Sequence, residues 1–143
     1  IVGAPNSGKS SLLNALVGFD RAIVSSASGT TRDTVEETLE INGQKIILTD
    51  TAGIREHALD PAEKEGMKRS LRAMQGADLI LFVLDSSRPL TPEEKDLWQD
   101  IRQQQKRTLI VLNKTDAVQK PVCPLAECGN YTVLPVSCKT GDG

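Results

Sequence analysis

A glycine-rich stretch near the start of the chain has the residue types and spacing of a phosphate-binding loop. Residues 3–10 read Gly-Ala-Pro-Asn-Ser-Gly-Lys-Ser, which fits the pattern Gly-x-x-x-x-Gly-Lys-Ser. In this pattern glycines turn backbone amides towards phosphate oxygens, the lysine contacts the β- and γ-phosphates, and the serine hydroxyl binds Mg²⁺. The sequence therefore predicts a nucleoside-triphosphate site. The expected contacts are Asn6, Ser7, Gly8, Lys9, Ser10 and Ser11, with Ser10 on Mg²⁺.

A second motif lies far along the chain, directly after an apolar run. Asn113, Lys114 and Asp116 follow residues 108–112, which have the composition of a buried strand. The Asp116 carboxylate can accept hydrogen bonds from N1–H and the exocyclic amine of guanine, whereas adenine has no matching pair of donors. We expect guanine to be preferred over adenine by at least about 100-fold. The residues after the last expected strand, Ser137, Cys138 and Lys139, are predicted to brace the base from its other side.

Two further loops contain residues suited to sensing a γ-phosphate. The stretch Asp50-Thr51-Ala52-Gly53 follows an expected strand and offers a carboxylate to the Mg²⁺ shell, through a water, and a glycine amide to the γ-phosphate. The other loop is small and polar, and we assign Thr31 in it to Mg²⁺; an ordinary flexible polar loop is the alternative. The nucleotide contacts expected from this loop are Ser25, Ser26, Ala27, Ser28, Gly29, Thr30 and Thr31.

The position after Gly53 lacks the glutamine that orients the attacking water in Ras-type GTPases. It is Ile54, whose apolar side chain cannot hold water, so hydrolysis needs another device. The amide oxygen of Asn6 and the carbonyls of residues 25–29 are candidates for holding a monovalent cation beside the phosphates. The alternative for Asn6 is an Asx turn that stabilises the loop.

Composition places the chain among globular proteins with an aliphatic core. Of its 143 residues 38% are hydrophobic, 25% charged and 3% aromatic. The net charge of −2 excludes a global basic field that would attract nucleic acid or an anionic membrane. No apolar run approaches the roughly 20 residues that span a bilayer, so we expect a cytosolic protein with no membrane partner. The cysteines Cys123, Cys128 and Cys138 fit no zinc or redox spacing and are expected to be ordinary thiols.

The elements that position these loops alternate between strand and helix. Periodicity and caps predict helices at 9–17, 61–74 and 92–104, and strands at 1–2, 35–41, 45–48, 79–84, 108–112 and 133–136. This α/β pattern predicts a mostly parallel sheet of about six strands with one antiparallel edge strand, helices on both faces, and ligands beyond the carboxyl ends of the strands. We expect a single domain over residues 1–143, excised from a longer protein, because its first strand is short and no closing helix follows the last.

Together these motifs resemble the GTPase domain of the bacterial tRNA-modification GTPases of the MnmE (TrmE) family. The resemblance covers nearly the whole chain and lies in residues 5–16, 22–24, 29–33, 50–56, 63–66 and 77–79. It implies a P-loop NTPase fold of the Ras-like type that binds GTP and GDP with Mg²⁺. It also implies hydrolysis stimulated by K⁺ when two such domains dimerise through their switch regions on GTP binding.

The family resemblance assigns roles that the residues alone leave open. Glu63 would help to position the attacking water, beside the catalytic residues Lys9 and Thr31; a solvated glutamate at a helix start is the alternative. The full-length family members act with the flavoprotein MnmG on the wobble uridine of tRNA. The K⁺ ion would be held by Asn6, the carbonyls of Ser25 and Ala27, and Thr30.

Two other interpretations compete with this one. A ribosome-assembly GTPase resembling Der or Era, acting as a switch on ribosomal RNA, shares Thr-Thr-Arg and the asparagine of the phosphate loop. The run Arg55-Glu56 and residues 63–66 argue against it. A P-loop ATPase or nucleotide kinase is disfavoured by residues 113–116.

Overall fold

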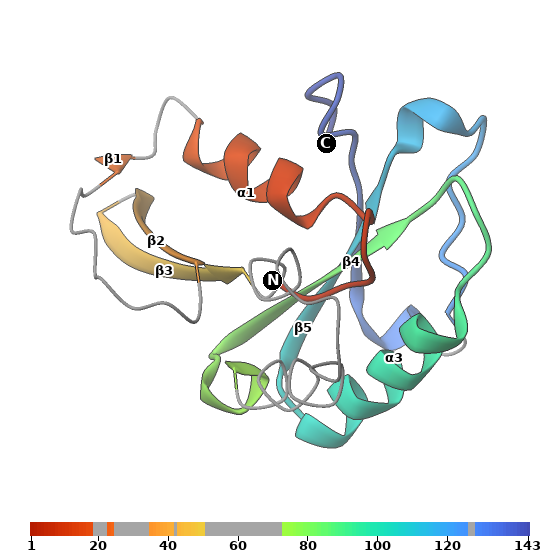
Figure 1. Ribbon diagram of the computed structural model, residues 1–143, viewed down its shortest axis with the longest axis horizontal. Helices are drawn as coiled ribbons and strands as arrows, with labels where there is room; N and C mark the ends of the chain where they lie inside the picture. The colour runs from red at the N-terminus through yellow and green to blue at the C-terminus, as the bar shows by residue number, and fades with distance from the viewer. Residues whose placement is uncertain (19–22, 25–34, 42, 51–72, 126–127) are drawn as a thin grey trace, which may run out of the picture.

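The computed structural model describes residues 1–18, 23–24, 35–41, 43–50, 73–125 and 128–143 (Figure 1). The described helices are α1 (Lys9–Val17) and α3 (Pro92–Gln104), with the short 3₁₀ turns η2 (Thr115–Ala117) and η3 (Cys128–Asn130). The strands are β1 (Ile23–Val24), β2 (Val35–Ile41), β3 (Gln44–Asp50), β4 (Leu79–Asp85), β5 (Arg107–Asn113) and β6 (Thr132–Pro135). In these parts of the chain, no helix is both long enough and apolar enough to span a membrane.

The strands pair in two groups, which the N-terminal segment joins. Strands β4, β5 and β6 form a parallel sheet, whereas β1, β2 and β3 form an antiparallel one. Val2 forms a parallel bridge with Phe82 of β4, and the backbone nitrogen of Ile1 donates to the carbonyl of Thr49 in β3 at 2.8 Å. Residues 1–2 therefore lie between β3 and β4 and link the two groups.

The antiparallel part is larger than the expected single edge strand. Strands β2 and β3 form a hairpin in which Ile41 pairs with Gln44 and Gly43 has a φ of 77°. The added strand β1 pairs with β2 through only two residues. Two residues are too few to show the alternation on which a strand prediction rests, which explains why the sequence analysis did not place a strand there.

Helices cover both faces of the parallel sheet, as predicted, with α1 and α3 on opposite sides of it (Figure 1). Side chains at alternate positions of a strand point to opposite faces. Phe82 accordingly packs with Trp98 of α3, their rings stacked with centroids 5.9 Å apart, while the adjacent Val83 packs with Leu12 of α1. This sheet is therefore buried on both faces, and its loops are held on a rigid frame.

Helix α3 begins where its cap predicts. The Thr91 side chain accepts a hydrogen bond from the Glu94 backbone, and the Glu94 side chain accepts one from the Thr91 backbone, which makes a capping box. The helix expected over residues 61–74 lies largely outside the described residues, although residues 73–76 are helical.

Candidate functional site

The polar motifs at the ends of the described strands meet at one edge of the parallel sheet. Residues 3–8 follow the strand residue Val2, Asp85 ends β4 and Asn113 ends β5, where the last two are paired in register. Ser137 comes just after β6. All of these lie at the carboxyl ends of parallel strands, where α/β sheets bind ligands.

Two glycines let the loop of residues 3–8 approach its neighbours closely. A Cβ atom on Gly3 would lie 2.4 Å from the carbonyl oxygen of Val83. Gly8 has a φ of +100°, in the left-handed region, and a Cβ atom there would lie 2.0 Å from Nδ2 of Asn113. Glycine at these two positions of the motif is therefore required by the fold as well as by any ligand.

The lysine of this loop is buried and bonded to the loop itself. Lys9 is 6% exposed, and its Nζ donates a hydrogen bond to the Ala4 carbonyl at 2.7 Å. Ser10 and Ser11 lie exposed in the first turn of α1, and Asn6 is exposed with a φ of 61°. The N-cap residue of α1 is Gly8, which has no side chain of its own to cap the positive end of the helix dipole.

Ser7 behaves differently from its neighbours in the loop. Its side chain is fully buried, and among the described residues its hydroxyl has no hydrogen-bond partner. Its carbonyl, by contrast, accepts a hydrogen bond from Nδ2 of Asn113 at 3.0 Å. The backbone of Ser7 thus ties the loop to β5, while its hydroxyl contributes nothing to the loop's hydrogen bonding.

Asn113 joins three loops through its side chain. While its Nδ2 donates to the Ser7 carbonyl, its Oδ1 accepts from the backbone N–H of Cys138 at 3.2 Å. The residue is 2% exposed. The Asn113 side chain therefore links the loop of residues 3–8 to the loops after β5 and β6. The motif alone did not reveal this structural role.

Asp116 is held in place by residues from the loop after β6. Its Oδ1 accepts a hydrogen bond from the Ser137 hydroxyl at 2.7 Å, and its Oδ2 lies 3.7 Å from Nζ of Lys139. The Ser137 bond lowers the pKa of Asp116 below its ordinary value, and burial opposes this shift without reversing it. The side chain is still 22% exposed, so a charged carboxylate is presented to a ligand at this edge.

The structure adds one residue that the sequence analysis did not single out. The Asp85 carboxylate accepts a hydrogen bond from Nζ of Lys114 at 2.6 Å and one from the backbone N–H of Ser87 at 2.9 Å. Burial acts to raise the pKa of Asp85, but these hydrogen bonds outweigh it and the pKa is lowered. A signal was present, because an aspartate at the end of an apolar run is unusual in a buried strand.

Several predicted site residues cannot be placed. Asp50 ends β3, but its side chain lies outside the described residues. The same holds for all of Ser25, Ser26, Ala27, Ser28, Gly29, Thr30, Thr31, Thr51, Ala52, Gly53, Ile54 and Glu63. Their assignments remain predictions.

The three cysteines are free thiols. Burial raises the pKa of Cys138, and it raises the pKa of Cys123 to about 11, helped by the neighbouring Cys128 thiol. Cys138 reaches the site through its backbone, which bonds Asn113.

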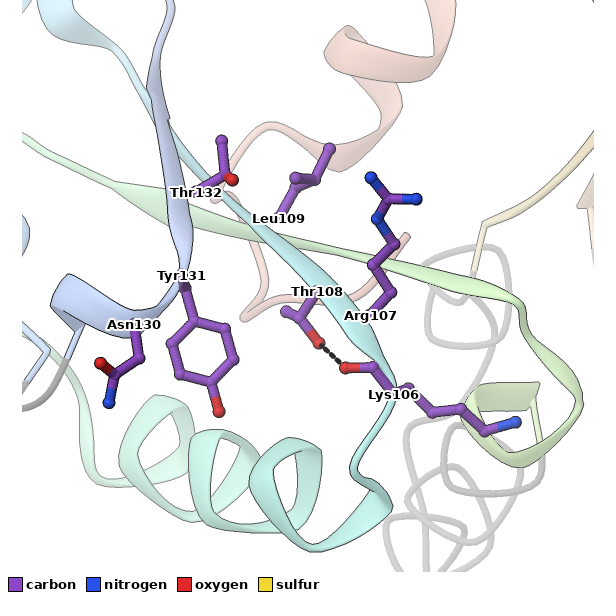
Figure 2. Close-up of a pocket in the computed structure, with 7 residues that line it drawn as sticks. All are labelled: Lys106, Arg107, Thr108, Leu109, Asn130, Tyr131 and Thr132. Carbon is purple, nitrogen blue, oxygen red and sulfur yellow. Dashed lines mark hydrogen bonds between the residues drawn. The ribbon is translucent and has the colours of Figure 1, made fainter.

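A separate hollow of about 290 Å³ lies at the opposite edge of the sheet, where β5 and β6 begin (Figure 2). Tyr131 and Thr108 line it, and the Thr108 hydroxyl donates to the Lys106 carbonyl at 3.0 Å. It shares no residue with the loops described above.

Comparison with known proteins shows the family to which the chain belongs. Residues 1–114 match the family model of the 50S ribosome-binding GTPases. The chain is 49% identical over 137 residues to the tRNA modification GTPase MnmE of Helicobacter pylori strain J99, covering 96% of this chain and 29% of that protein. It is 50% identical over 116 residues to MnmE of Lactiplantibacillus plantarum, covering 81% of this chain and 24% of the relative. The chain thus spans less than a third of the length of these relatives.

Solved structures agree on the fold. A crystal structure of Era with MgGDPNP and a segment of 16S ribosomal RNA superposes with a TM-score of 0.73 and 31% identity, covering 98% of this chain and 50% of that one. The G domain of the FeoB iron transporter of T. maritima superposes with a TM-score of 0.69 and 28% identity, covering 99% of this chain and 87% of that one. The predicted P-loop fold and the predicted resemblance to the MnmE GTPase domain are therefore both confirmed. The chain is a GTP-binding, GTP-hydrolysing domain and belongs to the family of 50S ribosome-binding GTPases.

Proposed function

We propose that this domain binds GTP and GDP at the edge where residues 3–10, Asn113 and Asp116 meet, and that it serves a protein that modifies tRNA. The observation that carries the proposal is the convergence of three loops, distant in sequence, at one sheet edge, tied by the two hydrogen bonds of Asn113. The tRNA-modifying activity rests on the identity of about half of the aligned residues with the MnmE relatives.

The two ends of the nucleotide would meet different chemistry. At the phosphate end the Lys9 ammonium and the amides at the start of α1 supply positive charge. At the base end the Asp116 carboxylate accepts from guanine N1–H and the exocyclic amine, braced by Ser137 and Lys139. Adenine has no N1–H and carries its amine at C6, so it offers Asp116 no matching pair of donors, and the site selects guanine.

The donor set fits Mg²⁺ on chemical grounds. Mg²⁺ prefers hard oxygen ligands, and the Ser10 hydroxyl lies in the first turn of α1 beside the phosphate loop. We propose Ser10, Thr31 and, through a water, Asp50 as its ligands. When bound, the ion would neutralise charge that develops on the phosphates during transfer.

Hydrolysis needs a substitute for the missing glutamine. We propose that K⁺, held by Asn6, Ser25, Ala27 and Thr30 where two domains dimerise, supplies the positive charge that an arginine finger supplies elsewhere. In this proposal Glu63 helps to position the attacking water. Asn6 supports the cation role because its side chain is exposed on the phosphate loop.

We extend the proposal to the full-length protein by its similarity to the MnmE relatives. As in the proposed family role, the full-length protein would act in the cytoplasm with a flavoprotein, MnmG, on the wobble uridine of tRNA, and residues 1–143 would form a single GTP-binding domain within it.

Turnover of GTP in K⁺ and in Na⁺ buffers of equal ionic strength tests the proposal. We expect at least about 10-fold faster hydrolysis in K⁺, because a sodium ion is too small for the same ring of oxygens. Asn6→Ala should remove the difference between the rates in K⁺ and in Na⁺. Equal rates of the unaltered protein in the two buffers would contradict the cation mechanism.

An Era-like role on ribosomal RNA is the second candidate, favoured by the TM-score of 0.73 with Era and by the matching family model. Binding assays with a tRNA and with a 16S ribosomal RNA fragment separate the two. Tight, GTP-dependent binding of the ribosomal fragment alone would support the Era-like role and contradict the tRNA role.

A further inference from the structure

Asp85 lies beside the base-reading loop yet is outside every motif assigned to the nucleotide. It is the last residue of β4, it pairs in register with Asn113, and it is 7% exposed. A carboxylate this deeply buried at the end of an apolar strand has a large desolvation cost, which only good partners can offset.

Both carboxylate oxygens of Asp85 have partners from different segments. Oδ2 accepts from Nζ of Lys114 at 2.6 Å, and Oδ1 accepts from the backbone N–H of Ser87 at 2.9 Å. Lys114 itself has a φ of 65°, a left-handed conformation that a lysine rarely adopts. The ion pair therefore holds a strained residue that lies two positions before Asp116.

Arg88 anchors the turn that contains Asp85 to helix α3. Arg88 lies 3.8 Å from Oδ2 of Asp85 and donates two hydrogen bonds, each 2.9 Å, to the buried carboxylate of Glu94. The Ser86 backbone and hydroxyl also donate to the Asn113 carbonyl, at 2.9 and 2.7 Å. Asp85 thus connects a rigid helix start with the loop that reads the base.

We propose that Asp85 is a positioning residue for guanine recognition. By fixing the Lys114 ammonium it holds the left-handed turn between Asn113 and Asp116, so that the Asp116 carboxylate faces the base without rearrangement. This inference rests on the proposed nucleotide site. It assigns Asp85 no contact with the nucleotide and no part in the hydrolysis step.

A double-mutant cycle on the protein at its natural length tests the role. Asp85→Asn should weaken GDP binding about 10-fold, in the range measured for coupled groups in contact, while kcat at saturating GTP stays within about twofold. In a Lys114→Met background, Asp85→Asn should weaken GDP binding by less than about twofold, because the ammonium group that Asp85 holds is gone. Asp96→Asn, at an exposed carboxylate of α3, is the matched control and should leave GDP affinity unchanged.

The outcomes separate a positioning role from a structural one. If Asp85→Asn weakens binding equally in both backgrounds, or lowers kcat as much as affinity, the positioning role is wrong. Should Asp85→Asn fail to fold, Lys114→Arg keeps the test open: affinity near that of the unaltered protein supports the ion pair, and affinity as low as that of Lys114→Met overturns it. An unaltered protein with no preference for GDP over ADP would instead defeat the proposed function.

Discussion

The base side and the phosphate side of the site differ in how their polar groups are satisfied. On the base side, Asp116 and Asn113 are each bonded by groups from neighbouring loops, and Asp116 still presents an exposed, charged edge. On the phosphate side, Lys9 is bonded to the Ala4 carbonyl of its own loop, and the Ser7 hydroxyl is buried without a partner among the described residues.

This difference indicates two modes of binding within one site. The base side is preorganised, because protein groups alone already hold Asp116 and Asn113 in position. The phosphate side gains partners on binding, because the Lys9 ammonium has three N–H donors and can donate to phosphate oxygens as well as to the Ala4 carbonyl. Base selectivity should therefore survive changes that disturb the phosphate loop.

The largest effect is expected at Asp116. Asp116→Asn should lower affinity for GTP about 100-fold or more and raise affinity for XTP, because the amide can donate to the C2 carbonyl of xanthine. Competition binding with the two nucleotides measures the change. Unaltered GTP affinity in this variant would remove Asp116 from the base site.

Gly8→Ala disturbs the close approach of Gly8, on the phosphate side, to Asn113, on the base side. The new Cβ would lie 2.0 Å from Nδ2 of Asn113, in a backbone with a φ of +100°, so we expect a loss of about 3 kcal/mol in the free energy of unfolding. Denaturant unfolding gives the value.

Gly43→Ala is the matched control, because Gly43 also has a positive φ, of 77°, but a Cβ atom there would meet nothing within 4 Å in the described part of the chain. Its loss should be about 1 kcal/mol, from backbone strain alone. Equal losses in the two variants would show that the Asn113 contact contributes nothing.

A smaller contrast compares two buried serines. Ser7→Ala removes a hydroxyl that has no hydrogen-bond partner among the described residues, and it should raise the free energy of unfolding by about 1 kcal/mol. Ser137→Ala removes a hydroxyl bonded to Asp116 and Thr140 and should lower it by about 1 kcal/mol. The same sign in both variants would contradict the contrast between the two sides.

The smallest expected effect is one of pH. The folded-state pKa of Asp116 lies below its ordinary value. The contribution of Asp116 to the free energy of unfolding is therefore complete above its unfolded-state pKa. It is lost only as the pH falls through the lowered folded-state pKa. The preference for GDP over ADP should therefore be constant between about pH 8 and pH 5. A preference that declines over this range would show that Asp116 is not held as a charged acceptor.

Much of this site could be predicted from the sequence because its motifs come directly after strands. The run of residues 108–112 and the cap at Thr91 each have a strong local signal, and β5 and α3 follow them closely. Contacts between loops have no such signal. The link that Asn113 makes between loops and the Asp85–Lys114 pair depend on which strands are neighbours, and periodicity along one strand carries no information on that.

The most direct test of the account is competition between GDP and ADP for the unaltered protein, measured against a fluorescent GDP analogue in the presence of Mg²⁺. If the base side is a preorganised guanine site, ADP should require at least about 100-fold higher concentration than GDP for the same displacement. Equal displacement by the two nucleotides would show that Asp116 does not distinguish guanine from adenine and that the base side is not a preorganised guanine site.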